Sequence, residues 1–304
     1  MGREHEIMST ETRRSELPSR TVVVGYDGSE LARAALALAG ERAGPGGRIV
    51  AVYAAAIARD AAVGMPAPTP PPAPPEELGQ RILAEVGEVQ AGDVPVTREV
   101  RIGHAAKALV EVARDEDADE IVVGSHGAGR LRALLGSTSH ALVHEADRPV
   151  VVLTERATER AAGPGEPAHL IVLGYDGSDD SVAALAYARR HLAPGGEILA
   201  VHAYHAPAEW KGTNTYNAAL QERLGHGQRL LDAIEAGPEV RGELIAGAPA
   251  TVLAKLGTSR DADEIIVGSR GLSTLRAALG SVAHAVLHEA DRPVVIVPRP
   301  DAAA

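Results

Sequence analysis

Three glycines and a serine follow a short run of β-branched residues, at a spacing that indicates a phosphate-binding loop. The run at 121–123 reads Ile-Val-Val, Gly124 and Gly127 follow it, and Gly136-Ser137 then opens an amphipathic segment. This pattern predicts a strand, a glycine loop and a helix N-terminus. Unpaired backbone N–H groups and the positive end of a helix dipole then meet at one point. Such a point favours a bound anion, above all a phosphate.

The same pattern returns about half a chain later. Residues 265–297, IIVGSRGLSTLRAALGSVAHAVLHEADRPVVIV, repeat residues 121–153, IVVGSHGAGRLRALLGSTSHALVHEADRPVVVL. In the last fourteen positions of these segments ten residues are identical, too many for two unrelated segments to share by chance. The sequence therefore predicts a phosphate-binding module that is present twice. In the second copy the matching residues are Gly268, Gly271, Gly280 and Ser281.

An aspartate follows the first predicted strand of each half. TVVVGYDGSE places Asp27 two residues after Gly25, and LIVLGYDGSDD places Asp176 two residues after Gly174. A carboxylate at the end of a strand can accept hydrogen bonds from the hydroxyl groups of a ligand. Aspartate and serine before a helix also cap free N–H groups, and glycines also serve tight turns, so these structural roles are an alternative interpretation.

Strands and helices alternate along each half. For the first half we predict strands at 22–24, 49–53, 96–102, 121–123 and 150–153, and helices at 31–38, 76–90, 104–114 and after 136. This order predicts an α/β fold in which helices cover both faces of a parallel sheet. The proline-rich stretch 66–75 is predicted to be an extended, exposed loop. The acidic run 115–120 is interpreted as a solvated turn.

The repeat sets the expected domain boundaries. Residues 1–19 are polar and charged without a period, which predicts a disordered arm. Domain 1 is expected at 20–154 and domain 2 at 168–299. Between them, residues 155–167 are rich in alanine, glycine and proline, as is typical of a linker.

Composition excludes several classes of protein. The net charge of −11 opposes binding to nucleic acid or to an anionic membrane surface. The absence of cysteine excludes disulfides and thiolate sites, and it fits a reducing cytoplasm. No uncharged apolar run approaches the roughly 18 residues of a membrane span. We therefore expect a soluble cytoplasmic protein without a nucleic-acid or membrane partner.

These motifs resemble those of the universal stress protein family in its tandem form. The resemblance rests on YDGS, on the GSHG…LLGS and GSRG…ALGS loops, and on the HEADRPVV tails. It implies two doubly wound domains, each with a five-stranded parallel sheet of order 3-2-1-4-5 and a ligand site beyond the carboxyl ends of the strands. ATP-binding members look like G-x2-G-x9-G-S/T, whereas both loops of this chain have eight residues before the last glycine.

The resemblance also implies roles for individual residues. Asp27 and Asp176 would contact ribose or a bridging Mg²⁺, Gly25 and Gly174 would let the backbone pass beside the nucleotide, and Ala54 and Ala203 would offer backbone groups to adenine. Phosphate donors would come from the loops and helix starts, with Arg130 as an added charge in the first domain, where the second has Thr274. These donors are Gly124, Gly127, Gly136, Ser137 and Thr138, and Gly268, Gly271, Gly280, Ser281 and Val282.

The implied function is an ATP-binding stress-response regulator, not a catalyst. No lysine occurs in the glycine loops, which argues against a fast nucleotide hydrolase or kinase. Two alternatives stay open: a scaffold for protein interactions, and a slow Mg²⁺-dependent ATPase. His140 with His144, and His284 with His288, could hold zinc by their spacing, but packing is the preferred interpretation, and no metal is expected.

Expected partners follow from the strands that end each domain. An apolar strand at a sheet edge invites pairing, so 150–153 and 294–297 are predicted to pair within one chain. A homodimer and further protein partners are left open.

Overall fold

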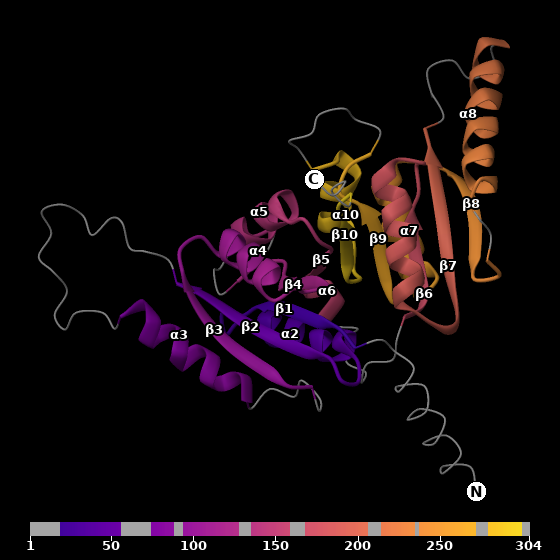
Figure 1. Cartoon of the computed structure of the whole chain (residues 1–304). Helices are drawn as coiled ribbons and strands as arrows, with labels where there is room; N and C mark the ends of the chain where they lie inside the picture. The colour runs from indigo at the N-terminus through magenta and orange to yellow at the C-terminus, as the bar shows by residue number, and fades with distance from the viewer. Residues whose placement is uncertain are drawn as a thin grey trace, which may run out of the picture. The chain divides into compact units, whose positions relative to one another are not determined.

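The chain forms two compact units, Met1–Glu145 and Ala146–Ala304, and each is an α/β domain (Figure 1). The computed structural model describes residues 19–55, 74–87, 94–127, 135–158, 168–205, 214–234, 237–271 and 279–299. The predictions for the N-terminal arm before residue 19, for Arg130 and for Thr274 lie outside the described residues.

The first unit alternates strands and helices as predicted. Its elements are β1 (Thr21–Gly25), α2 (Glu30–Ala43), β2 (Arg48–Ala55), α3 (Pro75–Ala84), the 3-10 turn η1 (Glu85–Gly87), β3 (Val96–Ile102), α4 (Ala105–Asp115), β4 (Glu120–Gly124) and α5 (Ser137–Glu145).

The strands of this unit run in the order β3-β2-β1-β4, and all three neighbouring pairs are parallel. In the centre, Val23 lies opposite Val50 on one side and Ile121 on the other. These three side chains are fully buried. Because helices cover both faces of a parallel sheet, such a strand is an almost continuous apolar run.

The second unit begins with the last strand of the first repeat. Its elements are β5 (Val150–Leu153), α6 (Glu155–Thr158), β6 (Ala168–Gly174), α7 (Asp179–His191), β7 (Leu192–Tyr204), α8 (Asn214–Asp232), β8 (Val240–Ala246), α9 (Pro249–Ser259), β9 (Glu264–Gly268), α10 (Ser281–Glu289) and β10 (Val294–Val297).

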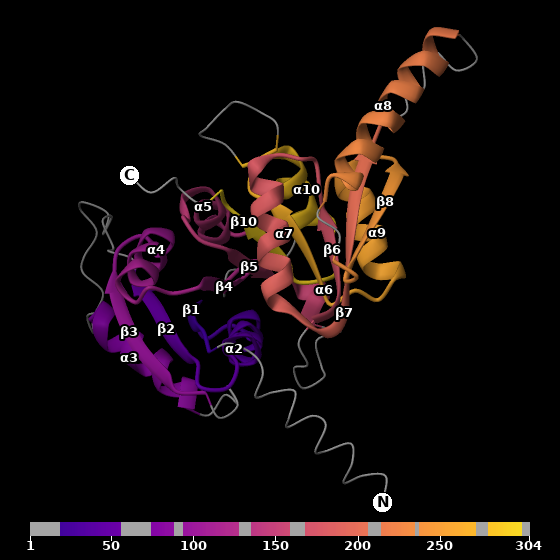
Figure 2. The same cartoon turned by 45° about the vertical axis from the view of Figure 1, so that its right-hand side comes forward.

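The strand order β8-β7-β6-β9-β10 confirms the predicted order 3-2-1-4-5. Figure 2 shows α8 beside β7 and β8, which it contacts. β5 joins this sheet by antiparallel pairing with β10, with Val151 opposite Val295. The predicted pairing of the two terminal strands within one chain is thereby confirmed. All residues of both strands are buried, as expected of apolar edges that cover each other.

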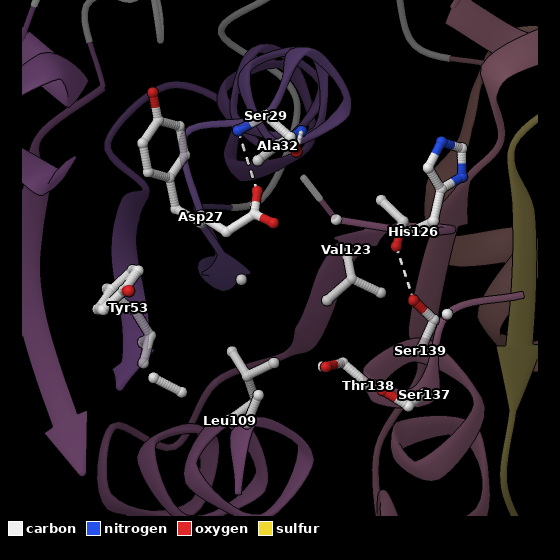
Figure 3. A pocket seen from close by; sticks show the side chains of 18 of the residues that line it. Asp27, Ser29, Ala32, Tyr53, Leu109, Val123, His126, Ser137, Thr138 and Ser139 are labelled. Atoms are coloured by element: carbon white, nitrogen blue, oxygen red, sulfur yellow. Dashed lines mark hydrogen bonds between the residues drawn. The ribbon is translucent and has the colours of Figure 1, made fainter. Parts of the chain in front are cut away.

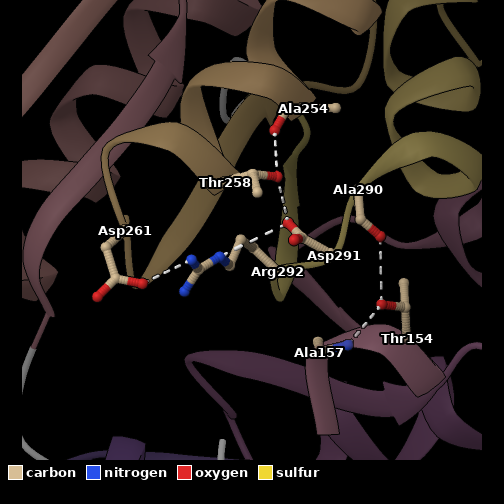
Figure 4. Close-up of polar contacts among 8 residues, drawn as sticks. All are labelled: Thr154, Ala157, Ala254, Thr258, Asp261, Ala290, Asp291 and Arg292. Carbon is tan, nitrogen blue, oxygen red and sulfur yellow. Dashed lines mark hydrogen bonds and ion pairs between the residues drawn. The ribbon is translucent and has the colours of Figure 1, made fainter. Parts of the chain in front are cut away.

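The turn before β10 is held by polar contacts (Figure 4). Arg292, whose side chain is 8% exposed, pairs with Asp261 at 2.8 Å and with the neighbouring Asp291. Asp291 also accepts a hydrogen bond from Thr258 at 2.9 Å. Asp261 has a positive φ of 55°, a conformation that aspartate tolerates better than most residues. Through these contacts the segment Glu289–Pro293 (EADRP), whose sequence both halves share, holds the turn before β10 against the C-terminal end of α9.

The interpretation of 115–120 as a solvated turn is wrong at its end. Glu120 is fully buried in β4, and both of its carboxylate oxygens accept hydrogen bonds from Arg42, at 2.7 and 3.0 Å. Asp119 accepts a hydrogen bond from the backbone N–H of Thr21 at 2.8 Å. A carboxylate can enter the sheet here because a guanidinium from α2 pairs with it.

Two further expectations need correction. The helix predicted at 76–90 is α3 and η1, and the helical period ends at Ala84. Leu78 of this helix is 41% exposed, whereas Gly79 is buried. The first four residues of the predicted linker form α6, because the Thr154 hydroxyl accepts a hydrogen bond from Ala157 N–H at 3.2 Å.

Within the described ranges, no helix has the length and apolar character that a membrane crossing requires.

Candidate functional site

A cavity of about 650 Å³ lies at the carboxyl ends of β1, β2 and β4. It brings together all the first-domain candidates for the ligand site that lie within the described residues. These are Gly25, Asp27, Ala54, Gly124, Gly127, Gly136, Ser137 and Thr138. The remaining lining residues are Tyr26, Ser29, Ala32, Val52, Tyr53, Ala105, Leu109, Val123, His126, Leu135 and Ser139.

Asp27 and Ser29 have separate roles at the turn between β1 and α2. Ser29 caps α2, because its hydroxyl accepts a hydrogen bond from Ala32 N–H at 3.1 Å. Asp27 Oδ1 accepts from Ser29 N–H at 3.0 Å, which orients the half-buried carboxylate. A methyl group on Gly127 would overlap Asp27 Oδ2. The glycine therefore permits the close approach of the loop to the carboxylate, and capping does not require Asp27.

The start of α5 is fastened to the end of β4. Gly136 N–H donates to Ser125 C=O at 2.7 Å, and the buried Ser139 hydroxyl donates to Gly124 C=O, also at 2.7 Å. These bonds hold the N-terminus of α5 at the cavity, where Ser137 is exposed and Thr138 is half-buried. The hydroxyl groups and N–H groups of this turn are the donors that an anion requires.

The opposite side of the cavity is apolar and aromatic. Tyr53 and Ala54 come from the end of β2, and Leu109 of α4 and Val123 of β4 form the floor (Figure 3). In the same view Asp27 lies between Tyr53 and the Ser137–Ser139 turn. The sequence reading missed Tyr53, Leu109 and His126. Their positions could have indicated them, because Tyr53 and His126 lie within two residues of a strand end and Leu109 lies on the inner face of a helix.

A glycine inside α3 makes room for Tyr53. A methyl group on Gly79 would lie 2.8 Å from Tyr53 Cδ1 and 2.8 Å from Val100 Cγ1. Glycine in a helix costs about 1 kcal/mol relative to alanine, so its presence in α3 has a packing reason. The ring of Tyr53 therefore packs directly against the backbone of α3 at Gly79.

We expect Gly79→Ala to destabilise the protein by about 1–2 kcal/mol, because overpacking outweighs the gain in helix propensity. Thermal unfolding followed by circular dichroism measures the change. Gly87→Ala is the matched control: its added methyl would meet only the end of the Arg98 side chain, and we expect less than about 0.5 kcal/mol. Equal effects of the two substitutions would contradict this role of Gly79.

The second domain has a smaller cavity of about 300 Å³ at the corresponding place. It contains every second-domain candidate: Gly174, Asp176, Ala203, Gly268, Gly271, Gly280, Ser281 and Val282. Asp176 Oδ1 accepts hydrogen bonds from the backbone N–H and the hydroxyl of Ser178, at 3.0 and 2.5 Å. His202 takes the place of Tyr53, and its Nδ1 lies 2.9 Å from Tyr175 C=O.

Two tyrosines beside the cavities have raised pKa values, and two pairs of histidines lie in contact. Burial raises the pKa of Tyr26 and of Tyr175 above the ordinary value, so both phenols are neutral at pH 7. His140 stacks edge-on against His144, and the ring of His284 lies 4.8 Å from that of His288. Among the residues whose positions are described, no group of three or more acidic or histidine side chains is arranged to hold a metal ion.

The family model and the curated relatives point to the same family. The sequence model of the Universal stress protein family matches residues 18–154 and again 168–298. Universal stress protein Rv2005c of Mycobacterium tuberculosis is 34% identical over 236 residues, 73% of this chain and 77% of the relative. A universal stress protein of Thermus aquaticus is 33% identical over 132 residues, 42% of this chain and 96% of the relative.

Among solved structures, a universal stress protein of Archaeoglobus fulgidus matches with a TM-score of 0.62. It is 20% identical and covers 93% of this chain and 97% of its own. At that identity the match shows the fold alone, in agreement with the tandem α/β architecture.

Proposed function

Because this chain belongs to the universal stress protein family, we propose that it is a regulator that binds adenine nucleotides, with ATP as the ligand of its first domain. One observation carries the proposal. A single cavity places Asp27 between an apolar, aromatic side and the N-terminal turn of α5. That order corresponds to the base, ribose and phosphates of a nucleotide.

The residues of the first cavity fit such a ligand. Its volume of about 650 Å³ lies within the range of roughly 300–1,000 Å³ that is typical of small-molecule sites. Tyr53 offers a ring for contact with adenine, and Asp27 offers an acceptor for ribose hydroxyls. Ser137 and Thr138, with the N–H groups at the start of α5, offer donors for phosphate oxygens.

A regulatory role is preferred to catalysis. Among its described residues, the lining of the first cavity contains no lysine, arginine or cysteine, so a side-chain cation of the kind that activates a phosphate is lacking there. Ser125 contacts His126 Nδ1 at 3.1 Å, but this serine is buried and does not line the cavity. Binding would then act by changing the stability or the surface of the domain. Slow hydrolysis with Asp27 holding Mg²⁺ is the alternative within this site.

We expect added ATP to raise the melting temperature of the full chain. A ligand that binds only the folded state stabilises it by about 2.7 kcal/mol at 100 times the dissociation constant. Differential scanning fluorimetry across an ATP series measures the shift, with inorganic phosphate at equal ionic strength as the control. Freshly purified protein should also release an adenine nucleotide on denaturation, which mass spectrometry identifies. No shift and no released nucleotide would favour the scaffold alternative.

The Asp27→Ala variant separates the non-catalytic regulator from the slow ATPase. Phosphate release that needs Mg²⁺ and disappears in this variant, while ATP affinity is retained, would favour the slow ATPase. A cytoplasmic location and the absence of nucleic-acid and membrane partners stay predictions from the sequence, and homodimer formation stays open.

A further inference from the structure

The two cavities differ in size and in the donors at their phosphate end. The second has a volume of about 300 Å³ against about 650 Å³ in the first. At the start of α10, Val282 and Ala283 stand where α5 has Thr138 and Ser139. The second cavity therefore has less room for a chain of phosphates, and it lacks the hydroxyl group that Thr138 offers in the first.

The second cavity has a charge that the first lacks. Arg270 lines it at the position of His126. The side chain is half-buried, and within the described ranges no carboxylate pairs with its guanidinium. A guanidinium can donate two parallel hydrogen bonds to one phosphate group. Together with the volume of about 300 Å³, this charge favours a ligand with a single phosphate group over one with an extended polyphosphate.

Asp180 holds the backbone of Arg270 in place. This carboxylate is 6% exposed and stands in α7 where the first domain has the apolar Leu31. Its Oδ2 accepts hydrogen bonds from the Ser269 hydroxyl at 2.8 Å and from Arg270 N–H at 3.0 Å. The start of the second glycine loop is thus fastened to α7 by a contact that Leu31 cannot make.

We propose that the second domain binds an adenine nucleotide with a single phosphate group, which Arg270 holds and Asp180 helps to position. The two halves of the chain would then respond to different nucleotides. This inference rests on the proposed nucleotide-binding function and names the ligand class of its second site.

Isothermal titration calorimetry of the full chain with ATP and with AMP tests the inference. We expect ATP to bind at one site per chain and AMP to bind at the other. Arg270→Gln should weaken AMP binding by about 10- to 100-fold and leave ATP binding unchanged, because hydrogen bonds to charged groups are the strong ones. Arg260→Gln is the matched control, since Arg260 pairs with Glu243 outside the cavity.

Asp180 is tested by two substitutions that differ in hydrogen bonding. Asp180→Asn keeps an acceptor oxygen and should hold AMP affinity within about threefold of the unsubstituted chain, whereas Asp180→Leu should lose about tenfold. Equal AMP affinity of the two variants would refute the positioning role, whatever their melting temperatures.

The outcomes separate this inference from the proposed function. Two equivalent ATP sites per chain, or AMP binding that survives Arg270→Gln, would overturn the inference and leave nucleotide binding intact. ATP binding at one site with no AMP binding at millimolar concentration would do the same. Binding of neither nucleotide would overturn both.

Discussion

Gly136→Val is expected to weaken ATP binding to the first domain by about 100-fold, close to 2.7 kcal/mol. A methyl group on Gly136 already lies 3.1 Å from His126 Cα and 3.1 Å from Ser125 O, both backbone atoms. Because Gly136 lines the cavity, we expect the two further carbons of valine to occupy part of it. They would meet the space in front of Ser137 and Thr138, where we place the phosphates.

The matched control is Gly136→Ala, which adds the same tight backbone contacts without the two further carbons and should cost less than about tenfold. Isothermal titration calorimetry with ATP measures both affinities, and circular dichroism shows whether each variant is folded. If the valine variant is folded and binds ATP as tightly as the alanine variant, the phosphates do not lie at the start of α5. If the valine variant is unfolded, Thr138→Val asks the same question, because Val282 occupies the matching position of the second domain.

Arg42→Ala is expected to lower the free energy of unfolding by about 3–5 kcal/mol, since it removes one partner of a buried ion pair. The side chain of Glu120 is 0% exposed and that of Arg42 is 10% exposed. Both carboxylate oxygens would lose a charge-assisted hydrogen bond inside the sheet. Chemical denaturation followed by circular dichroism measures the loss.

Arg33→Ala is the matched control on the same helix. Arg33 pairs with Glu85 at 3.0 Å, but the two side chains are 44% and 47% exposed, so solvent screens the pair and we expect about 0–1 kcal/mol. Replacing both buried partners, as in Arg42→Met with Glu120→Leu, should recover most of the loss. A loss as small for Arg42→Ala as for Arg33→Ala would show that the buried pair contributes little.

The candidate site was largely predictable because it is built from chain geometry. Backbone groups at strand ends and helix starts are positioned by the order of elements, and that order is visible in apolar runs, glycines and repeats. Asp27, Gly127 and Gly136 could therefore be assigned to one site although about 100 residues separate the first from the others. Tyr53 and Arg270 could not, because an aromatic or a basic residue near a strand end has many other roles.

The predictions from the sequence failed mainly at charged residues that are buried in the fold. Asp115 to Glu120 looks like a solvated run, yet its last carboxylate is fully buried at the start of β4. The compensating guanidinium comes from a helix 78 residues away, and no local pattern connects the two. The same holds for Asp180, whose hydrogen-bond partners lie 89 and 90 residues further along the chain.

By itself the sequence determined the α/β alternation, the duplication, the pairing of the two terminal strands and the glycines of both loops. These features follow from local periodicity and from the similarity between the two halves, and both are properties of the order of residues alone. Only the tertiary structure decided that the two cavities differ in volume and that Asp180 fastens one loop and not the other. Such differences depend on contacts between side chains that are far apart in the sequence, and these contacts form only when the distant elements pack together.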